Sequence, residues 1–239
     1  MTLVKLTTVA VLALVLGACQ SLFQPNLRTP LEVKRDRWEH IKPGGDTADC
    51  PLVNIDTIHF PANPKLDAIV EKRLLQMTQD NERNPLPSSL KAYEDQFMAT
   101  AEARHSSYLQ AKVHEQHDGL VIIEFSSYLD TGGAHGMPGR GFINYSRQQD
   151  KVLSLQDMLV PGQEATFWKI AEEAHKGWLA STGMDKDPEF VKTWPFRQTP
   201  HIALTYGAVV LKYEVYSIAP YSMGHIELKL PYLRLNGVI

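Results

Sequence analysis

The residues best placed to do chemistry together lie in the glycine-rich segment Tyr128-Leu-Asp-Thr-Gly-Gly-Ala-His-Gly136. Asp130 and His135 could form a general acid–base pair, or could be two ligands of a metal whose third ligand is distant in sequence. Backbone amides in such a segment could instead bind an anion. We favour a structural interpretation, in which the segment is a shaped hairpin connection that His135 fixes by hydrogen bonds.

A second segment, Tyr213-Glu-Val-Tyr-Ser-Ile-Ala-Pro-Tyr-Ser-Met-Gly224, predicts a rigid turn with aromatic side chains beside it. Pro220 and Gly224 shape the turn, and Tyr216 and Tyr221 stand close to it. Aromatic side chains on a rigid turn offer a large contact area at a small entropic cost, which suits protein recognition. The alternative is two core tyrosines that flank a turn. The predicted partner-binding residues are Gly132, Gly133, His135, Pro220 and Tyr221.

No complete catalytic set accompanies these segments. The G-x-S-x-G motif and a phosphate-binding loop are both absent from the sequence. His114 and His117 could ligate a metal, but a solvated strand end explains them better, and Glu172 and Glu173 fall on the polar face of a helix. We therefore expect a protein that is not an enzyme, with no catalytic residue, no metal site and no cofactor.

Cys19 points to chemistry of another kind, because it ends the run Leu16-Gly-Ala-Cys19 after Lys5 and an apolar stretch. A charged start, a short apolar region and small residues are typical of a signal peptide, and the stretch is shorter than the ~20 residues that span a bilayer. The run resembles the lipobox of bacterial lipoproteins. That resemblance implies that residues 1–18 are removed and that lipid on Cys19 anchors the chain to the membrane of the cell envelope. Because Gln20 follows, the resemblance implies the outer membrane in a Gram-negative host.

Composition is that of a globular protein: 239 residues, 44% hydrophobic, 21% charged, with a net charge of −3. A mildly acidic chain without a basic block argues against a nucleic-acid partner. Two cysteines exclude a disulfide framework and a cysteine-ligated zinc site.

The elements that must position the two segments can be predicted from hydrophobic periodicity. Residues 19–50 are expected to form a lipidated tether without regular structure, residues 51–106 a helix-containing module, and residues 107–239 a C-terminal domain. Strands are predicted over Leu52–Phe60, Tyr108–Glu115, Leu120–Tyr128 and Phe142–Tyr145 and over two closing segments, one around Val209–Val215 and one around Ile226–Leu230. Asp118-Gly119 indicates a hairpin, and Asp130–Gly141 is expected to be a loop.

Helices are predicted after Pro64, after Ser88 or Ser89, after the capping-box segment Ser154-Leu-Gln-Asp157, and over residues 163–180. The longest should bury Phe167, Ile170, Ala171, Ala174 and Trp178, and 182–200 should be irregular. Helices and strands come in runs, so we predict an α+β fold with one largely antiparallel sheet packed against helices. Its helix-facing side should contain Val121, Ile123, Phe125, Val209, Leu211, Val215, Ile226 and Leu228.

Four motifs in order carry a resemblance: Thr131–Gly136, Asn144-Tyr145, Leu153–Leu159 and Tyr213–Gly224. Together they resemble the C-terminal domain of unknown function, with its N-terminal companion module, of the RsiV/PdaC family. In the anti-sigma factor RsiV the extracellular part resembles a lysozyme receptor, and in the deacetylase PdaC the region accompanies a separate catalytic domain that has no counterpart here.

The resemblance implies a cell-envelope lipoprotein with a non-catalytic domain that binds a lysozyme-type muramidase or peptidoglycan. The alternatives are a peptidoglycan-acting enzyme or accessory factor that uses His135, and a structural factor of the envelope.

Overall fold

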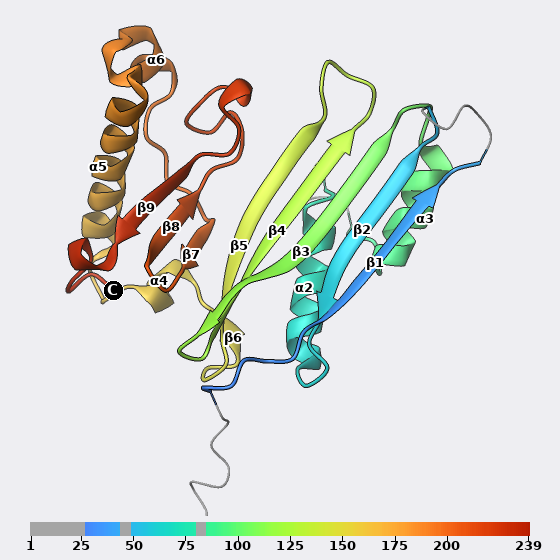
Figure 1. Cartoon of the computed structure of the whole chain (residues 1–239), viewed down its shortest axis with the longest axis horizontal. Coiled ribbons are helices and arrows are strands. Elements are labelled where there is room, and N and C mark those ends of the chain that lie inside the picture. The colour runs from blue at the N-terminus through green and yellow to red at the C-terminus, as the bar shows by residue number, and fades with distance from the viewer. Residues whose placement is uncertain (1–26, 44–48, 80–84) are drawn as a thin grey trace, which may run out of the picture.

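The computed structural model describes residues 27–43, 49–79 and 85–239. Cys19 and the predicted signal peptide lie outside these residues. Two sheets organise the described chain (Figure 1). The larger has six strands in the order of the sequence: β1 (Lys34–Ile41), β2 (Leu52–His59), β3 (Ser106–His117), β4 (Leu120–Asp130), β5 (Met137–Ser146) and β6 (Lys151–Val152).

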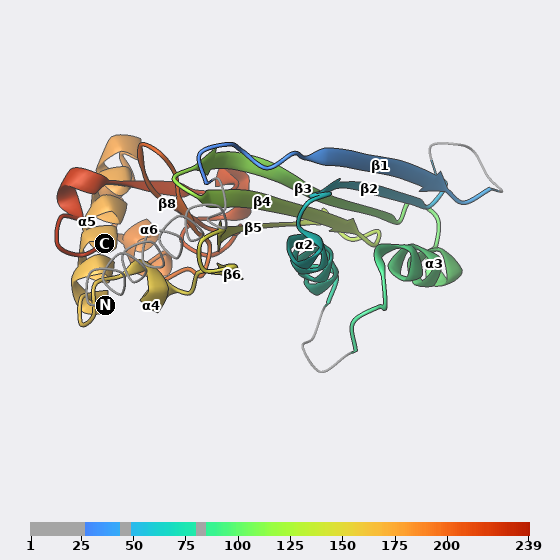
Figure 2. The same ribbon diagram turned by 90° about the horizontal axis from the view of Figure 1, so that it is seen from below.

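Two helices, α2 (Pro64–Gln76) and α3 (Leu90–Thr100), cover one face of the large sheet, as the edge-on view shows (Figure 2). Each begins with a capping side chain: Asn63 accepts a hydrogen bond from the Leu66 amide and Ser89 from the Ala92 amide. The two predicted helices are thereby confirmed, and of the two candidate caps Ser88 and Ser89 it is Ser89 that caps α3.

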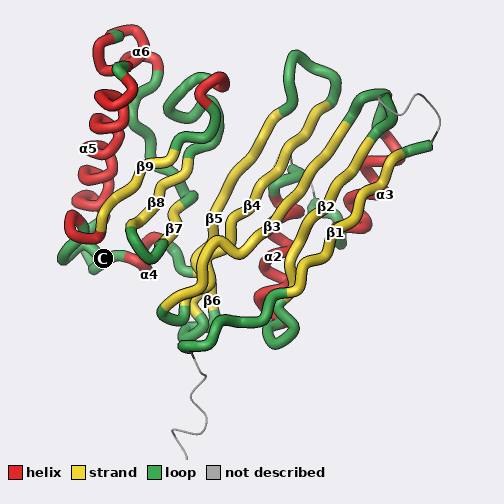
Figure 3. Tube along the Cα trace, viewed as in Figure 1, coloured by secondary structure: helices red, strands yellow, loops and turns green. Residues whose placement is uncertain are grey.

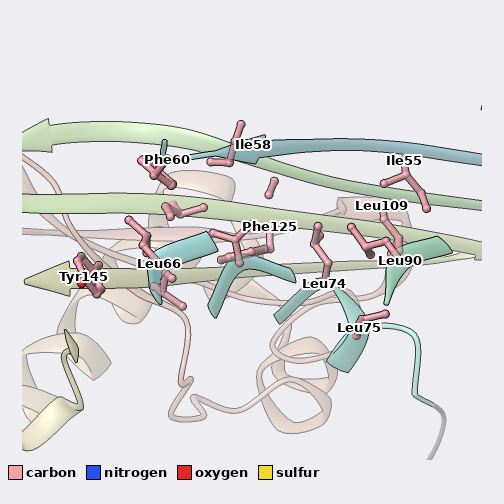
Figure 4. Packing of buried hydrophobic residues seen from close by; sticks show 14 of the residues in the cluster. Ile55, Ile58, Phe60, Leu66, Leu74, Leu75, Leu90, Leu109, Phe125 and Tyr145 are labelled. Atoms are coloured by element: carbon pink, nitrogen blue, oxygen red, sulfur yellow. The ribbon is translucent and has the colours of Figure 1, made fainter. Parts of the chain in front are cut away.

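Apolar side chains between α2, α3 and the sheet form the first core (Figure 4). Val121, Ile123 and Phe125 alternate along β4 and are fully buried against these helices, as predicted. β3 and β4 meet in the predicted hairpin, where Asp118 (φ 47°) and Gly119 (φ 76°) adopt the left-handed backbone of a two-residue turn.

The second sheet has three antiparallel strands, β7 (Ile202–Leu204), β8 (Ala208–Lys212) and β9 (Glu227–Pro231), beside helix α5 (Glu164–Thr182). Phe167, Trp168 and Ala171 of α5 pack on this sheet to form a second core. The short helix α4 (Leu155–Met158) precedes α5 and has the predicted capping box, which links Ser154 and Asp157.

One buried side chain joins the two sheets. Asn144 of β5 donates from Nδ2 to the carbonyl of Ile202 (2.7 Å), and its Oδ1 accepts from the amide of Leu204 (2.8 Å). It thus supplies the hydrogen bonds that a neighbouring strand would give to β7. An ion pair between Glu124 of β4 and Lys212 of β8 (2.7 Å) adds a second link.

The α+β class and the largely antiparallel pairing are correct, but the strands form two sheets and not one. Among the described strands, β2 and β3 pair in parallel, and Val209, Leu211 and Leu228 belong to the second sheet. Apolar and polar residues alternate in the same way in the strands of both sheets, so hydrophobic periodicity alone does not assign a strand to one sheet or the other. The large sheet also continues across the expected boundary between residues 106 and 107, and the change of sheet comes between β6 and β7.

Three segments expected to be irregular contain regular structure, visible in the tube drawing (Figure 3). Residues 34–41 of the predicted tether form the edge strand β1, whose charged, exposed residues hide the usual alternation. Residues 137–141 of the predicted loop belong to β5, where they pair with residues 125–129 of β4, and Gly139 and Gly141 obscure this strand in the sequence. Helix α6 (Pro188–Thr193) begins at the cap Asp187 within 182–200.

The buried face of α5 is also rotated from the predicted stripe. Phe167 and Ala171 are buried as expected, but Trp168, His175 and Leu179 complete the face, while Ile170, Ala174 and Trp178 are only partly buried. His175 stacks on the ring of Trp178 at 5.6 Å, so a residue that would be assigned to the polar side lies in an aromatic cluster.

Candidate functional site

The glycine-rich loop, residues 131–136, connects β4 to β5. At its start the Asp130 carboxylate accepts a hydrogen bond from the Gly132 amide (2.9 Å), and Gly132 has a left-handed backbone (φ 82°). That amide is therefore already engaged and is not open to an anion.

Gly136 closes the loop against the sheet. A Cβ at this position would lie 2.3 Å from Cζ of Tyr128, so only glycine lets the chain pass this ring. The carbonyl oxygen of Gly136 accepts hydrogen bonds from the Tyr221 hydroxyl (3.0 Å) and from Nδ1 of His135 (3.1 Å). The loop is thereby tied to a residue 85 positions away.

The second segment forms the turn between β8 and β9. Ile218 and Ala219 are buried in the second core, and Pro220 leads into the 3-10 helix η2 (Tyr221–Met223), which ends at Gly224 (φ 67°). Before this turn, Tyr216 adopts a left-handed backbone (φ 64°) and is 47% exposed. Such a conformation is uncommon for an aromatic residue and marks a position held by its surroundings.

The two segments meet in one aromatic patch, which consists of His135, Tyr216 and Tyr221. The rings of His135 and Tyr221 stack with centroids 4.0 Å apart, and the rings of Tyr216 and Tyr221 lie 5.6 Å apart. Nε2 of His135 lies 3.2 Å from the Tyr216 hydroxyl. In the tautomer with the proton on Nδ1, which faces a carbonyl, Nε2 accepts from that hydroxyl.

On another side of the loop, Gly132 and Gly133 line a hollow of about 500 Å³ with Asp130, His105 and Tyr108. The five predicted binding residues thus divide between two neighbouring surfaces: the glycines border the hollow, whereas His135, Pro220 and Tyr221 belong to the patch and its turn. Tyr216 was not among the predicted binding residues. The only sequence signal for a role of Tyr216 is that it lies close to the turn, because the left-handed backbone conformation of a tyrosine cannot be predicted from the sequence.

The arrangement does not assemble the alternative acid–base pair. Asp130 forms a hydrogen bond with the Gly132 amide, whereas His135 forms hydrogen bonds with the Gly136 carbonyl and the Tyr216 hydroxyl. Within the described ranges no group of three or more His, Cys, Asp or Glu side chains is placed to hold a metal ion. What the patch offers is a preformed aromatic surface with polar edges.

The two-sheet α+β architecture is shared with solved bacterial proteins. A DUF3298 family protein from Pseudomonas aeruginosa PAO1 is 66% identical, with a TM-score of 0.84 over 89% of this chain and 96% of that chain. A DUF3298 member from Bacteroides fragilis NCTC 9343 has the same fold at 18% identity, with a TM-score of 0.70 over 87% and 93% of the two chains.

The sequence profile of DUF3298, described as a protein of unknown function, matches residues 156–233. The chain belongs to the DUF3298 family. The matched residues contain the turn with Tyr216 and Tyr221 but not the glycine-rich loop. A comparison with curated proteins finds no match. In the parts of the chain that the structure describes, every helix is too short or too polar to cross a membrane.

Proposed function

We propose that this protein is a cell-envelope lipoprotein that binds a lysozyme-type muramidase through the aromatic patch and performs no chemistry of its own. The observation that carries the proposal is the stacking of His135 on Tyr221. It joins two segments, each of which has the composition of a recognition loop, into one surface.

The composition of the patch favours a protein partner. Tyrosines and nearby Met137, which is exposed directly after the loop, are side chains enriched at protein interfaces. The hydrogen bonds of Tyr221 and His135 to Gly136 hold two of the rings before a partner arrives, so little conformational entropy is lost on binding. A stable complex needs a buried area of about 1,200 Å² or more, so the hollow beside Gly132 and Gly133 would extend the contact.

The choice of a muramidase rests on the resemblance of the motifs to the RsiV/PdaC family, and the acidic net charge suits a cationic partner. The envelope location rests on the lipobox-like segment before Cys19. Lipid at Cys19 would hold the patch near the peptidoglycan on which such an enzyme acts.

The experiment compares three activities of the purified chain: binding to a c-type lysozyme, binding to isolated peptidoglycan, and release of products from peptidoglycan. The proposal predicts lysozyme binding without product release. Hydrolysis or deacetylation of peptidoglycan that is lost in His135→Ala would replace it with the enzyme alternative. Absence of all three activities would favour a structural role in the envelope.

A further inference from the structure

A separate cavity of about 340 Å³ lies where the end of α2 meets β4, β5 and the residues before β7. Three groups on its wall carry or can carry positive charge: Arg73 of α2, Arg140 of β5 and His201. Glu214 is the only acidic residue among the described residues that line it. The size is at the low end of the range for small-molecule sites.

The two guanidinium groups of this wall, those of Arg73 and Arg140, have no salt-bridge partner within the described ranges, although Arg140 interacts with Glu124 at longer range. Burial lowers the pKa of Arg140, and burial with the charge of Arg73 lowers the pKa of His201 to about 4. His201 is therefore neutral at pH 7, and the cationic groups of the wall are the two guanidinium groups.

Two residues of the cavity wall each have a buried polar atom without a hydrogen-bond partner within the described residues: Nε of Arg73 and Nδ1 of His201. Groups of this kind are rare in folded proteins and call for a partner. Both side chains lie beside Gly141 of β5. A Cβ at this position would lie 3.1 Å from Nδ1 of His201, so the glycine allows the close approach of the imidazole ring, whereas Nη2 of Arg73 would lie at an ordinary contact distance of 3.7 Å.

We propose that this cavity binds a small ligand through an oxyanion, either a carboxylate or a phosphate, held by Arg73 and Arg140. Planar guanidinium groups match both anions and form strong charge-assisted hydrogen bonds with them. A second guanidinium group in one small cavity offsets the repulsion from Glu214. Met137 borders both this cavity and the surface beside the aromatic patch, but none of the three patch residues lines the cavity.

The test titrates the full chain, purified in detergent, with sodium phosphate and separately with sodium acetate at constant ionic strength, followed by calorimetry. We expect saturable binding of at least one anion, and the anion that binds identifies the ligand class. Arg73→Gln should weaken that binding at least about tenfold, because a hydrogen bond to a charged group is lost. Binding of neither anion, or unchanged binding by Arg73→Gln, would overturn the proposal.

Glu214→Gln is the opposite control, because it removes the one negative charge from the wall and should raise the affinity for the anion. If Arg73→Gln does not fold, Glu214→Gln alone tests the proposal. A Glu214→Gln variant that binds the anion with the same affinity as the wild type would then reject the site. Tyr216→Gly should leave anion binding unchanged while it removes the proposed protein contact, which separates this inference from the proposed function.

Discussion

Tyr216 combines exposure, a left-handed backbone and a hydrogen bond to His135. A left-handed conformation costs a residue with a Cβ about 1–2 kcal/mol, and glycine escapes this cost. We predict that Tyr216→Gly changes the free energy of unfolding by less than about 1 kcal/mol, because relief of strain offsets the lost contacts. The same variant should weaken muramidase binding by about 2 kcal/mol or more, as at an interface hot spot. Chemical denaturation and equilibrium binding measure the two quantities. A large loss of stability with intact binding would make Tyr216 a structural residue.

Gly136 and Gly133 form a matched pair in the same loop. A Cβ at Gly136 would collide with Tyr128, whereas at Gly133 the nearest atom would be a carbonyl oxygen 4.0 Å away. Gly136→Ala should therefore displace the loop and reduce muramidase binding, while Gly133→Ala should leave the loop in place. Equal binding of the two variants would mean that the position of the loop is unimportant for recognition.

At the scale of elements, helix α5 depends on Phe167, which is 1% exposed and packed between α5 and the second sheet. We predict that Phe167→Ala lowers the free energy of unfolding by about 3–5 kcal/mol, because it removes a large buried side chain and leaves a cavity. Lys169→Ala on the exposed side is the control and should change it by less than about 0.5 kcal/mol. A loss below about 1 kcal/mol for Phe167→Ala would contradict the packing of α5.

The sequence predicted correctly those features that depend on the residues of a single helix, strand or turn. The Asp118-Gly119 turn, the Ser154 capping box and the alternation of Val121, Ile123 and Phe125 all follow from local chemistry. The division into two sheets did not, because the strands of both sheets alternate alike and the link through Asn144 joins residues 58 and 60 positions apart in the sequence. The patch was foreseen as two separate loops, since nothing local to either loop indicates that His135 will stack on a ring 86 positions further along the chain.

For the molecule as a whole, buried histidines should set the response to acid. Burial lowers the pKa of His201 to about 4 from 6.5, and burial also lowers the pKa values of His175 and His225. Below pH 6.5 the histidine side chains bind protons in the unfolded chain, whereas the buried histidines stay neutral in the folded chain. The free energy of unfolding is therefore highest above pH 6.5 and falls between pH 6.5 and 4. His201→Asn should reduce that fall by up to about 3 kcal/mol. Denaturant unfolding at pH 7 and pH 4.5 tests this, and an equal fall in the variant and the wild type would contradict it.

The proposed attachment to the envelope also concerns the whole molecule. Cys19→Ala should leave an uncleaved precursor without lipid, because the thiol that would be acylated is gone. Mass spectrometry of the mature amino terminus checks this, and a terminus at a residue other than Cys19 in the wild type would defeat the prediction.

We propose that the surface built from residues 131–136 and 216–224 recognises a muramidase. Amide hydrogen–deuterium exchange of the purified chain, with and without a saturating c-type lysozyme, tests this most directly. We expect slower exchange in both segments together and little change over residues 34–38 of β1, at the edge of the large sheet and away from Ile41 at the hollow. Unchanged exchange in both segments, or protection confined to another surface, would contradict it.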